Sequence, residues 1–241
     1  PLGAGFCPAM DVLSRRFFAG EKFDPRSALI TSLSLTLLLR TGQIEFAVMA
    51  ALLAIGSKFL LRIRGKHIFN PANFAIVSLM LFSDQVWVST GQWGNTMLGA
   101  VLLGAGGLLI LNRARRAETS FAFFGVFAAL YIARGLILGD PLSIALHQLQ
   151  NGALLVFTFF MISDPRTCPD SGRGRLIYGA LVALVAYLIE TQLFIPAGPI
   201  WALAFCAPVV ILIDRLSSGP RYEWFRVVPR FSFARSSGGH Q

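Results

Sequence analysis

Long runs of apolar residues, separated by short polar stretches, recur along most of the chain. A run of roughly 20 apolar residues can cross a lipid bilayer as a helix. Shorter runs are tolerated where neighbouring helices shield a span, or where two half-helices share one crossing. The apolar segments are eight: 26–39, 43–61, 68–83, 95–111, 119–139, 142–163, 176–192 and 197–213. The pattern predicts an all-α, polytopic membrane protein with about eight transmembrane helices, some of them short or broken.

Composition supports this class. Hydrophobic residues make up 55% of the 241 positions and charged residues only 14%, whereas a soluble domain usually carries about a quarter charged residues. The mean hydropathy is +0.64.

The basic residues gather on one side of the predicted membrane layout. If the chain starts in the cytoplasm, all but Arg40 and Arg134 of its 21 Lys and Arg residues fall on the cytoplasmic side. The positive-inside rule therefore predicts a multi-pass protein of a bacterial inner membrane, with both termini cytoplasmic.

This layout divides the chain into three parts. They are a cytoplasmic N-terminal segment (1–25), a transmembrane domain (26–214) and a basic cytoplasmic tail (215–241). The tail combines arginines with Trp and Phe, which suits contact with membrane lipids. The net charge of +9 is thus explained by membrane orientation, and no nucleic-acid partner is expected.

The chain also hints at two halves, divided near 113–118. Each half contains an X–Pro motif at the end of a span, "FNPAN" in the first and "SDPRT" in the second. Interrupted spans in matching positions indicate inverted repeats with a polar site between them.

In "FNPAN", Pro71 favours a helix that begins at that residue, with Asn70 as its N-cap. Capping explains one of the two asparagines. Asn73 lies one turn further on the same side, and two carboxamides on one face can bind the polar edge of a flat ring. Capping alone and ligand contact are both open interpretations.

In "SDPRT", Asp164 ends an aromatic, apolar run. It is either a charge at the end of a span, paired with a nearby arginine, or an acid that points back into a cavity. An acidic side chain at membrane depth is costly and is usually functional.

The stretch "SIALHQLQNGALL" puts four polar side chains into a predicted span: His147, Gln148, Gln150 and Asn151. We expect them to face the bundle interior, water or a ligand rather than lipid. His147 and Asn151 are four residues apart and should share a helix face. Pro141 suggests a broken or re-entrant entry into this span.

No catalytic or metal-binding residue is predicted. The three cysteines, Cys7, Cys168 and Cys206, form no CxxC pair, and no nucleophile–base arrangement is evident. The acids Glu45 and Glu190 fall at the outer face in this layout, where a functional role is the less favoured interpretation.

Three stretches together resemble the RnfD/NqrB family of membrane subunits, including RnfD-like proteins of enediyne clusters. They are "GKHIFNPANFAIV", "GQWGNTMLGAVLLGAGGLLI" and "FFMISDPRTCPDSGRGRLIYGAL", and the resemblance extends over about 27–214. It implies an electron-transport subunit of an ion-translocating oxidoreductase complex, with other membrane subunits as partners. The rival functions are a small-solute transporter or channel, and a structural subunit of a larger membrane complex.

The resemblance also implies a flavin, either riboflavin or FMN. The Ser-Gly-Ala-Thr motif that carries covalent FMN in the family is absent from this sequence, so noncovalent binding is expected. Asn70 and Asn73 become the main candidate contacts, with Asp164 a weaker one. Phe69 is a candidate for ring stacking, and the pair His147 and Asn151 completes the predicted site.

Overall fold

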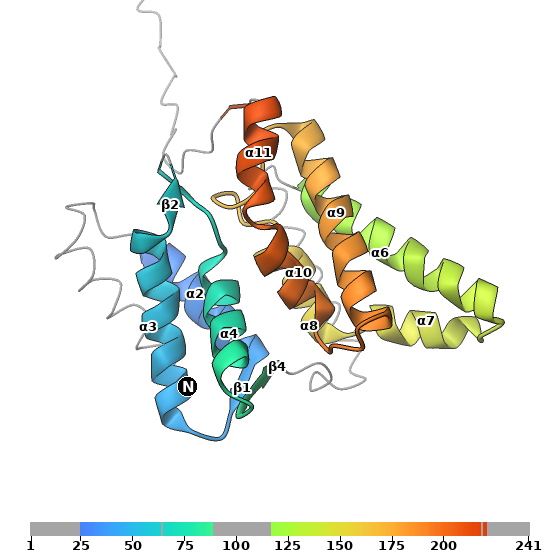
Figure 1. Cartoon of the computed structure of the whole chain (residues 1–241), viewed down its shortest axis with the longest axis horizontal. Coiled ribbons are helices and arrows are strands. Elements are labelled where there is room, and N and C mark those ends of the chain that lie inside the picture. The colour runs from blue at the N-terminus through green and yellow to red at the C-terminus, as the bar shows by residue number, and fades with distance from the viewer. Residues whose placement is uncertain (1–24, 64, 89–116, 218, 221–241) are drawn as a thin grey trace, which may run out of the picture.

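The computed structural model describes residues 25–63, 65–88, 117–217 and 219–220 (Figure 1). Within these residues, each predicted apolar segment coincides with a helix or with successive helices. The segment 95–111 lies outside the described residues. The helical class is therefore confirmed, and the number of crossings has to be judged from the helix lengths.

The first part of the chain builds three helices and two short antiparallel ribbons. The elements are α2 (Pro25–Leu38), β1 (Leu39–Thr41), α3 (Ile44–Leu60), β2 (Arg62–Ile63), β3 (Lys66–His67), α4 (Pro71–Phe82) and β4 (Val86–Val88). Strand β1 pairs with β4, with Leu39 opposite Val88, and β2 pairs with β3. Gly65, at φ +79°, occupies the turn between β2 and β3, where a left-handed backbone favours glycine. These ribbons are not part of the prediction.

The second part is helical throughout its ordered elements. They are α6 (Ala117–Leu138), α7 (Leu142–Leu149), α8 (Gly152–Val156), the π-helical turn η1 (Phe157–Met161), α9 (Gly172–Thr191), α10 (Gly198–Cys206) and α11 (Val209–Leu216). Figure 1 shows α2, α3 and α4 on one side of the molecule and α6 to α11 on the other, with α10 nearest to α4.

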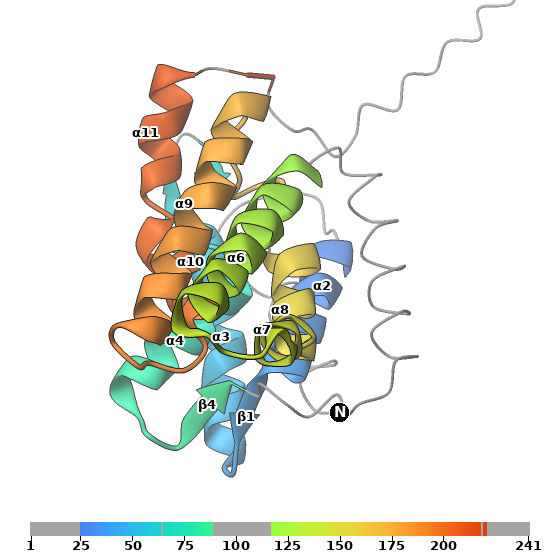
Figure 2. The same ribbon diagram turned by 90° about the vertical axis from the view of Figure 1, so that its right-hand side faces the viewer.

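The long helices α6 and α9 lie side by side, as Figure 2 also shows. Their close approach depends on Gly179, because a Cβ atom there would lie 2.5 Å from the carbonyl oxygen of Thr119 and 3.0 Å from Cβ of Ala122. Small residues permit such close packing of helices in membranes.

Two helix pairs are sharply bent. Helix α7 meets the segment of α8 and η1 at 52°, and α10 meets α11 at 53°. Pro208 lies at the second bend, where its ring disfavours a straight helix. By length and composition, α6 and α9 can cross a membrane, and up to four crossings result if each bent pair counts as one. The prediction of eight crossings is not confirmed by the described residues.

The outer surface is apolar, as expected for contact with lipid. Phe82 on α4 and Ile137 on α6 are 88% and 82% exposed. Small residues such as Ala50, Ala54 and Ala75 are buried instead, so the interior is formed in part by closely packed helix backbones.

Candidate functional site

The two proline motifs, which are far apart in sequence, meet in the structure. Nδ2 of Asn70, at the start of α4, lies 3.4 Å from Oδ2 of Asp164 in the loop after η1. The same amide nitrogen lies 3.4 Å from the carbonyl oxygen of Met161, at the end of η1. Both hydrogen bonds are long. Asn70, Asn73 and Asp164 form what we call the junction, because they join the two sides of the molecule.

Asn70 is the N-cap of α4, as predicted. Its Oδ1 accepts a hydrogen bond of 3.1 Å from the backbone N–H of Asn73, and Pro71 occupies the first helical position. Since its Nδ2 donates across the junction, both ends of the Asn70 amide are already used within the protein. Asn70 is therefore better placed to hold the junction together than to bind a further group.

Asn73 is in a different state. Its side chain is 1% exposed, and neither its amide nitrogen nor its amide oxygen has a hydrogen-bond partner. A buried amide usually finds partners, because leaving it unsatisfied costs about 1–3 kcal/mol. The capping interpretation thus accounts for Asn70 and leaves Asn73 unexplained.

Asp164 is held by its own loop. Its Oδ1 accepts the backbone N–H of Arg166 at 3.0 Å, and its carbonyl oxygen accepts the backbone N–H groups of Thr167 and Cys168. Burial raises the pKa of Asp164, and the N–H and positive charge of Arg166 lower it in part, as do the charges of Lys58 and Lys66.

The arginine of α9 does not pair with Asp164. Arg175 instead binds Glu118 at 3.2 Å, so the pairing proposed for an end-of-span aspartate is wrong for this arginine. The acid belongs to the interior junction between Asn70 and its own loop.

A charged cluster lies beside the junction. Nζ of Lys66 forms ion pairs of 3.1 Å with Asp170 and 2.7 Å with Asp214, which tie the β2–β3 turn to the loop before α9 and to α11. These residues border a cavity of about 260 Å³. His67 and Ile68, which lead into the FNPAN motif, also line it.

Phe69 flanks the junction on its aromatic side. Its ring centroid lies 5.5 Å from that of Phe74 on α4, at an interplanar angle of 46°. The ring is half-buried. The predicted aromatic surface is therefore present next to the amides.

The other predicted pair is separated from the junction and from each other. His147 is exposed on α7, and Gln150 is exposed at the helix break. The prediction that His147 and Asn151 share one helix face is wrong, because the helix stops between them. Asn151 begins a new helix as the N-cap of α8, accepting the backbone N–H of Ala153 at 2.9 Å.

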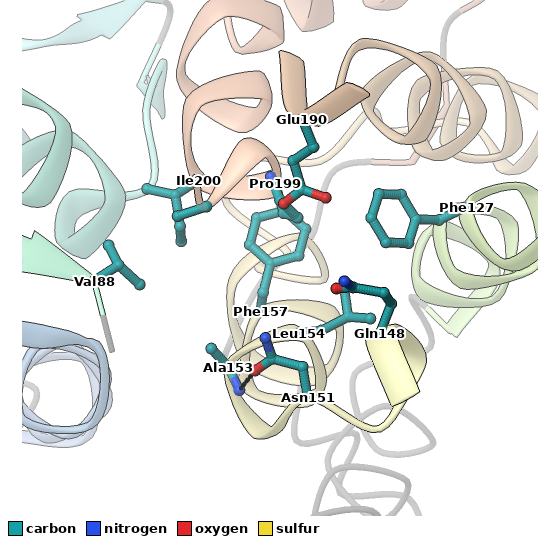
Figure 3. Close-up of a pocket in the computed structure, with 11 residues that line it drawn as sticks. Val88, Phe127, Gln148, Asn151, Ala153, Leu154, Phe157, Glu190, Pro199 and Ile200 are labelled. Atoms are coloured by element: carbon teal, nitrogen blue, oxygen red, sulfur yellow. Dashed lines mark hydrogen bonds between the residues drawn. The ribbon is translucent and has the colours of Figure 1, made fainter. Parts of the chain in front are cut away.

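A second, smaller cavity lies next to Asn151 (Figure 3). Its volume is about 40 Å³, and Glu190 of α9 projects into it with Gln148 of α7. The sequence analysis assigned Glu190 to the outer face without a function. Only the contact with Tyr131, 59 positions away, and the backbone turn before α10 reveal its surroundings.

These features define a helical membrane protein whose broken helices and buried polar groups lie between two sets of spans. The chain belongs to the NQR2, RnfD, RnfE family, whose model matches residues 81–222, more than half of the sequence. The resemblance read from the sequence motifs is thereby confirmed.

The similar proteins are all ion-translocating oxidoreductase complex subunits D. The one from Pectobacterium atrosepticum is 34% identical over 160 residues, covering 65% of this chain and 43% of the relative. The one from Tolumonas auensis is 31% identical over 153 residues, covering 64% and 40%. The one from Haemophilus influenzae is 34% identical over 124 residues, covering 52% and 34%. The chain thus spans about two fifths or less of the length of these curated relatives.

Proposed function

We propose that this protein is an electron-transport subunit of an ion-translocating oxidoreductase complex, and that it holds a flavin without a covalent bond. The family and the names of the relatives support the class of complex. The single observation that supports a bound group at the junction is the buried, unsatisfied amide of Asn73.

The residues of the junction suit one edge of a flavin. A carboxamide presents a donor and an acceptor side by side, which matches the alternating N–H and carbonyl groups of such a ring. Among the predicted amides, Asn73 would make this contact, because both ends of the Asn70 amide are occupied. A bound flavin would supply the electron-transfer chemistry, while the protein would supply position and electrostatic surroundings.

Asn70 and Asp164 would then act as positioning residues. Asn70 fixes the first turn of α4, and with it the backbone of Asn73, through the 3.1 Å cap bond. Asp164 fixes Asn70 from the opposite side. The aromatic rings of Phe69 and Phe74 would offer an apolar surface beside the amide. The two cavities described above are lined by other residues, so Asn73 carries the fit.

The test is the absorbance spectrum of the purified full chain in detergent, followed by acid extraction. We expect flavin to be released without proteolysis, as for noncovalent binding. Asn73→Leu should weaken flavin binding about 5- to 150-fold, because it removes an amide worth roughly 1–3 kcal/mol from a buried polar edge.

Asn70→Ser is the matched variant. Serine keeps an N-cap oxygen but lacks the amide that donates across the junction. We expect a smaller loss of flavin than with Asn73→Leu, because a positioning residue acts only through its neighbour. Full flavin content in Asn73→Leu, with an unchanged unfolding midpoint, would contradict the assignment of this residue.

One observation favours a second function. Discontinuous helices such as α7–α8 and α10–α11 are typical of transporters, where they surround a solute near the middle of the membrane. Uptake of a solute by vesicles containing the protein, with no flavin in the same preparation, would favour transport over electron transfer.

A further inference from the structure

The small cavity at Glu190 is a polar space surrounded by apolar helices. It lies among α6, α7, α8, α9, α10 and β4, and Figure 3 shows its lining side chains. Its walls include Phe127, Phe157 and Ile200, whereas Glu190, Gln148 and Asn151 contribute the polar groups. A carboxylate so close to membrane-spanning helices is costly unless it has a function.

The carboxyl group of Glu190 is fixed from two sides. The hydroxyl of Tyr131 on α6 donates to Oε2, and the backbone N–H of Gly198 donates to Oε1 at 3.0 Å. These contacts leave each oxygen with a further lone pair for a proton or a water molecule.

The turn before α10 is shaped to bring Gly198 to the carboxylate. Ala197 adopts a left-handed conformation at φ +59°, which is uncommon for a residue other than glycine. At Gly198 a Cβ atom would lie 2.5 Å from the carbonyl oxygen of Ala186 and 2.6 Å from Cγ of Glu190. Only glycine allows this approach, so the local backbone is built around the acid.

The opposite wall offers hydrogen-bond donors as well as acceptors. Oδ1 of Asn151 is occupied by the backbone N–H of Ala153, so Asn151 turns its NH₂ group toward the cavity. Gln148 directs its amide into the same space (Figure 3). A bare metal cation prefers a shell of oxygen ligands, whereas water binds equally well to donors and acceptors.

The volume also fits water. A cavity needs roughly 10–15 Å³ of this measure to hold one water molecule, and about 40 Å³ is present. Water molecules in this space would have Glu190, Gln148 and Asn151 as polar partners, which is the number that buried water usually requires.

The end of α7 adds a negative field. The last carbonyl groups of a helix lack intrahelical donors and carry partial negative charge. The break at Gln150 places this end of α7 next to the cavity, beside Gln148. Half-helix C-terminal ends bind Na⁺ or H⁺ in membrane transporters, so this region favours a positive charge.

The other titratable and charged groups near the site are few in the described residues. Tyr131 and Arg134 lie on α6, Tyr187 on α9 and the exposed His147 on α7. None of them forms an ion pair with Glu190 in the described part of the chain.

We propose that Glu190 is a proton-binding site supplied by water in this cavity. A hydronium ion in the cavity gives up a proton, an O–H bond forms on a carboxylate oxygen of Glu190, and a water molecule remains. Release is the reverse step. The chain alone binds this proton. Its use in ion movement rests on the proposed function, for which it would identify the ion as H⁺.

The test is infrared difference spectroscopy of the full chain in lipid vesicles, recorded between acidic and alkaline pH. We expect a C=O band of a protonated carboxyl group that titrates with pH and is absent in Glu190→Gln. The matched control is Glu45→Gln, which removes an exposed acid at the start of α3 and should retain the band.

A second variant covers the case in which Glu190→Gln fails to fold. Gln148→Leu removes one of the polar partners of the water but leaves the acid in place. We expect the band to persist and to exchange with D₂O several times more slowly than in the wild type.

Three outcomes would overturn the proposal. Retention of every protonated-carboxyl band in a folded Glu190→Gln variant would assign the residue to structural capping of α10. A carboxylate band that shifts with sodium at constant pH, without titrating, would indicate a metal cation. Unchanged exchange in Gln148→Leu would exclude water in this cavity as the path. Flavin absorbance of the same samples reports separately on the proposed function.

Discussion

The protein uses the same local device at two places with different results. Asn70 and Asn151 each cap the first turn of a helix through a side-chain oxygen. At Asn70 the remaining amide group reaches across 94 positions to Asp164 and closes a buried contact. At Asn151 the remaining amide group faces a cavity. A cap therefore fixes where a helix starts, and its long-range partner decides whether the surroundings close or stay open.

The two regions also differ in what holds them. The junction and its charged neighbour are linked by side chains from distant segments, including the ion pairs of Lys66. The region around Asn151 depends on a local cap and on a helix break. Loss of a side chain should therefore cost more stability at the junction side than at the cavity side.

The largest effect is expected at Lys66. Lys66→Met would leave Asp170 and Asp214 close together without the shared cation, and all three side chains are largely buried. Removing one partner of a buried ion pair costs about 3 kcal/mol or more. A clear fall of the thermal unfolding midpoint in detergent is expected.

The matched control is Arg215→Met. Arg215 lines the same cavity but is exposed and has no ion pair among the described residues. It should change the midpoint little. If the two variants unfold at the same temperature, Lys66 does not join the two sides of the molecule.

An intermediate effect separates the two asparagines. Asn151→Leu should cost about 1 kcal/mol, the usual value of an N-cap. Asn70→Leu loses its cap and its donated hydrogen bonds to Met161 and Asp164, for roughly 2–4 kcal/mol in total. Thermal unfolding of the two variants gives the comparison directly.

The serine variants show which part of each loss is capping. Asn151→Ser should restore nearly all of the stability, because serine is also a good N-cap. Asn70→Ser should restore only part, because the contact across the junction stays absent. Equal recovery at both positions would mean that the 3.4 Å contacts contribute nothing.

Local sequence signals predicted the helices and the cap at Asn70, because both depend on neighbouring residues. Pro71 fixes the start of α4 whatever lies elsewhere in the chain. The two bends were harder to predict. The Asn151–Gly152 pair and Pro208 are turn signals, but each lies within an apolar run that is long enough to pass for one continuous span.

The contacts that complete the sites were beyond local reasoning. Asn70 meets Asp164, and Glu190 meets Tyr131, only after packing of the helices. The left-handed turn at Ala197 has no propensity signal, since alanine rarely adopts it. The cytoplasmic placement of both termini and the repeat of two halves stay predictions, because 1–24, 89–116 and 221–241 lie outside the described residues.

The smallest effect concerns the pH dependence of stability at the junction. Burial raises the pKa of Asp164 above its ordinary value of 3.8. The unfolded chain therefore loses this proton at lower pH than the folded chain. As pH rises from 3.8 through the raised pKa, the folded state binds more protons than the unfolded state, so stability falls.

Asp164→Asn removes this titration but keeps a side-chain oxygen for the N–H of Arg166. Relative to this variant, the wild type should lose stability as pH rises above 3.8, until the pH passes the raised pKa. Thermal unfolding at a series of pH values measures the difference, with Asp84→Asn on the exposed loop after α4 as the charge control. Parallel curves for wild type and Asp164→Asn would show that the positive charges nearby offset the burial fully. The junction would then hold an ordinary carboxylate, and the Asn70–Asp164 contact would be a charge-assisted hydrogen bond.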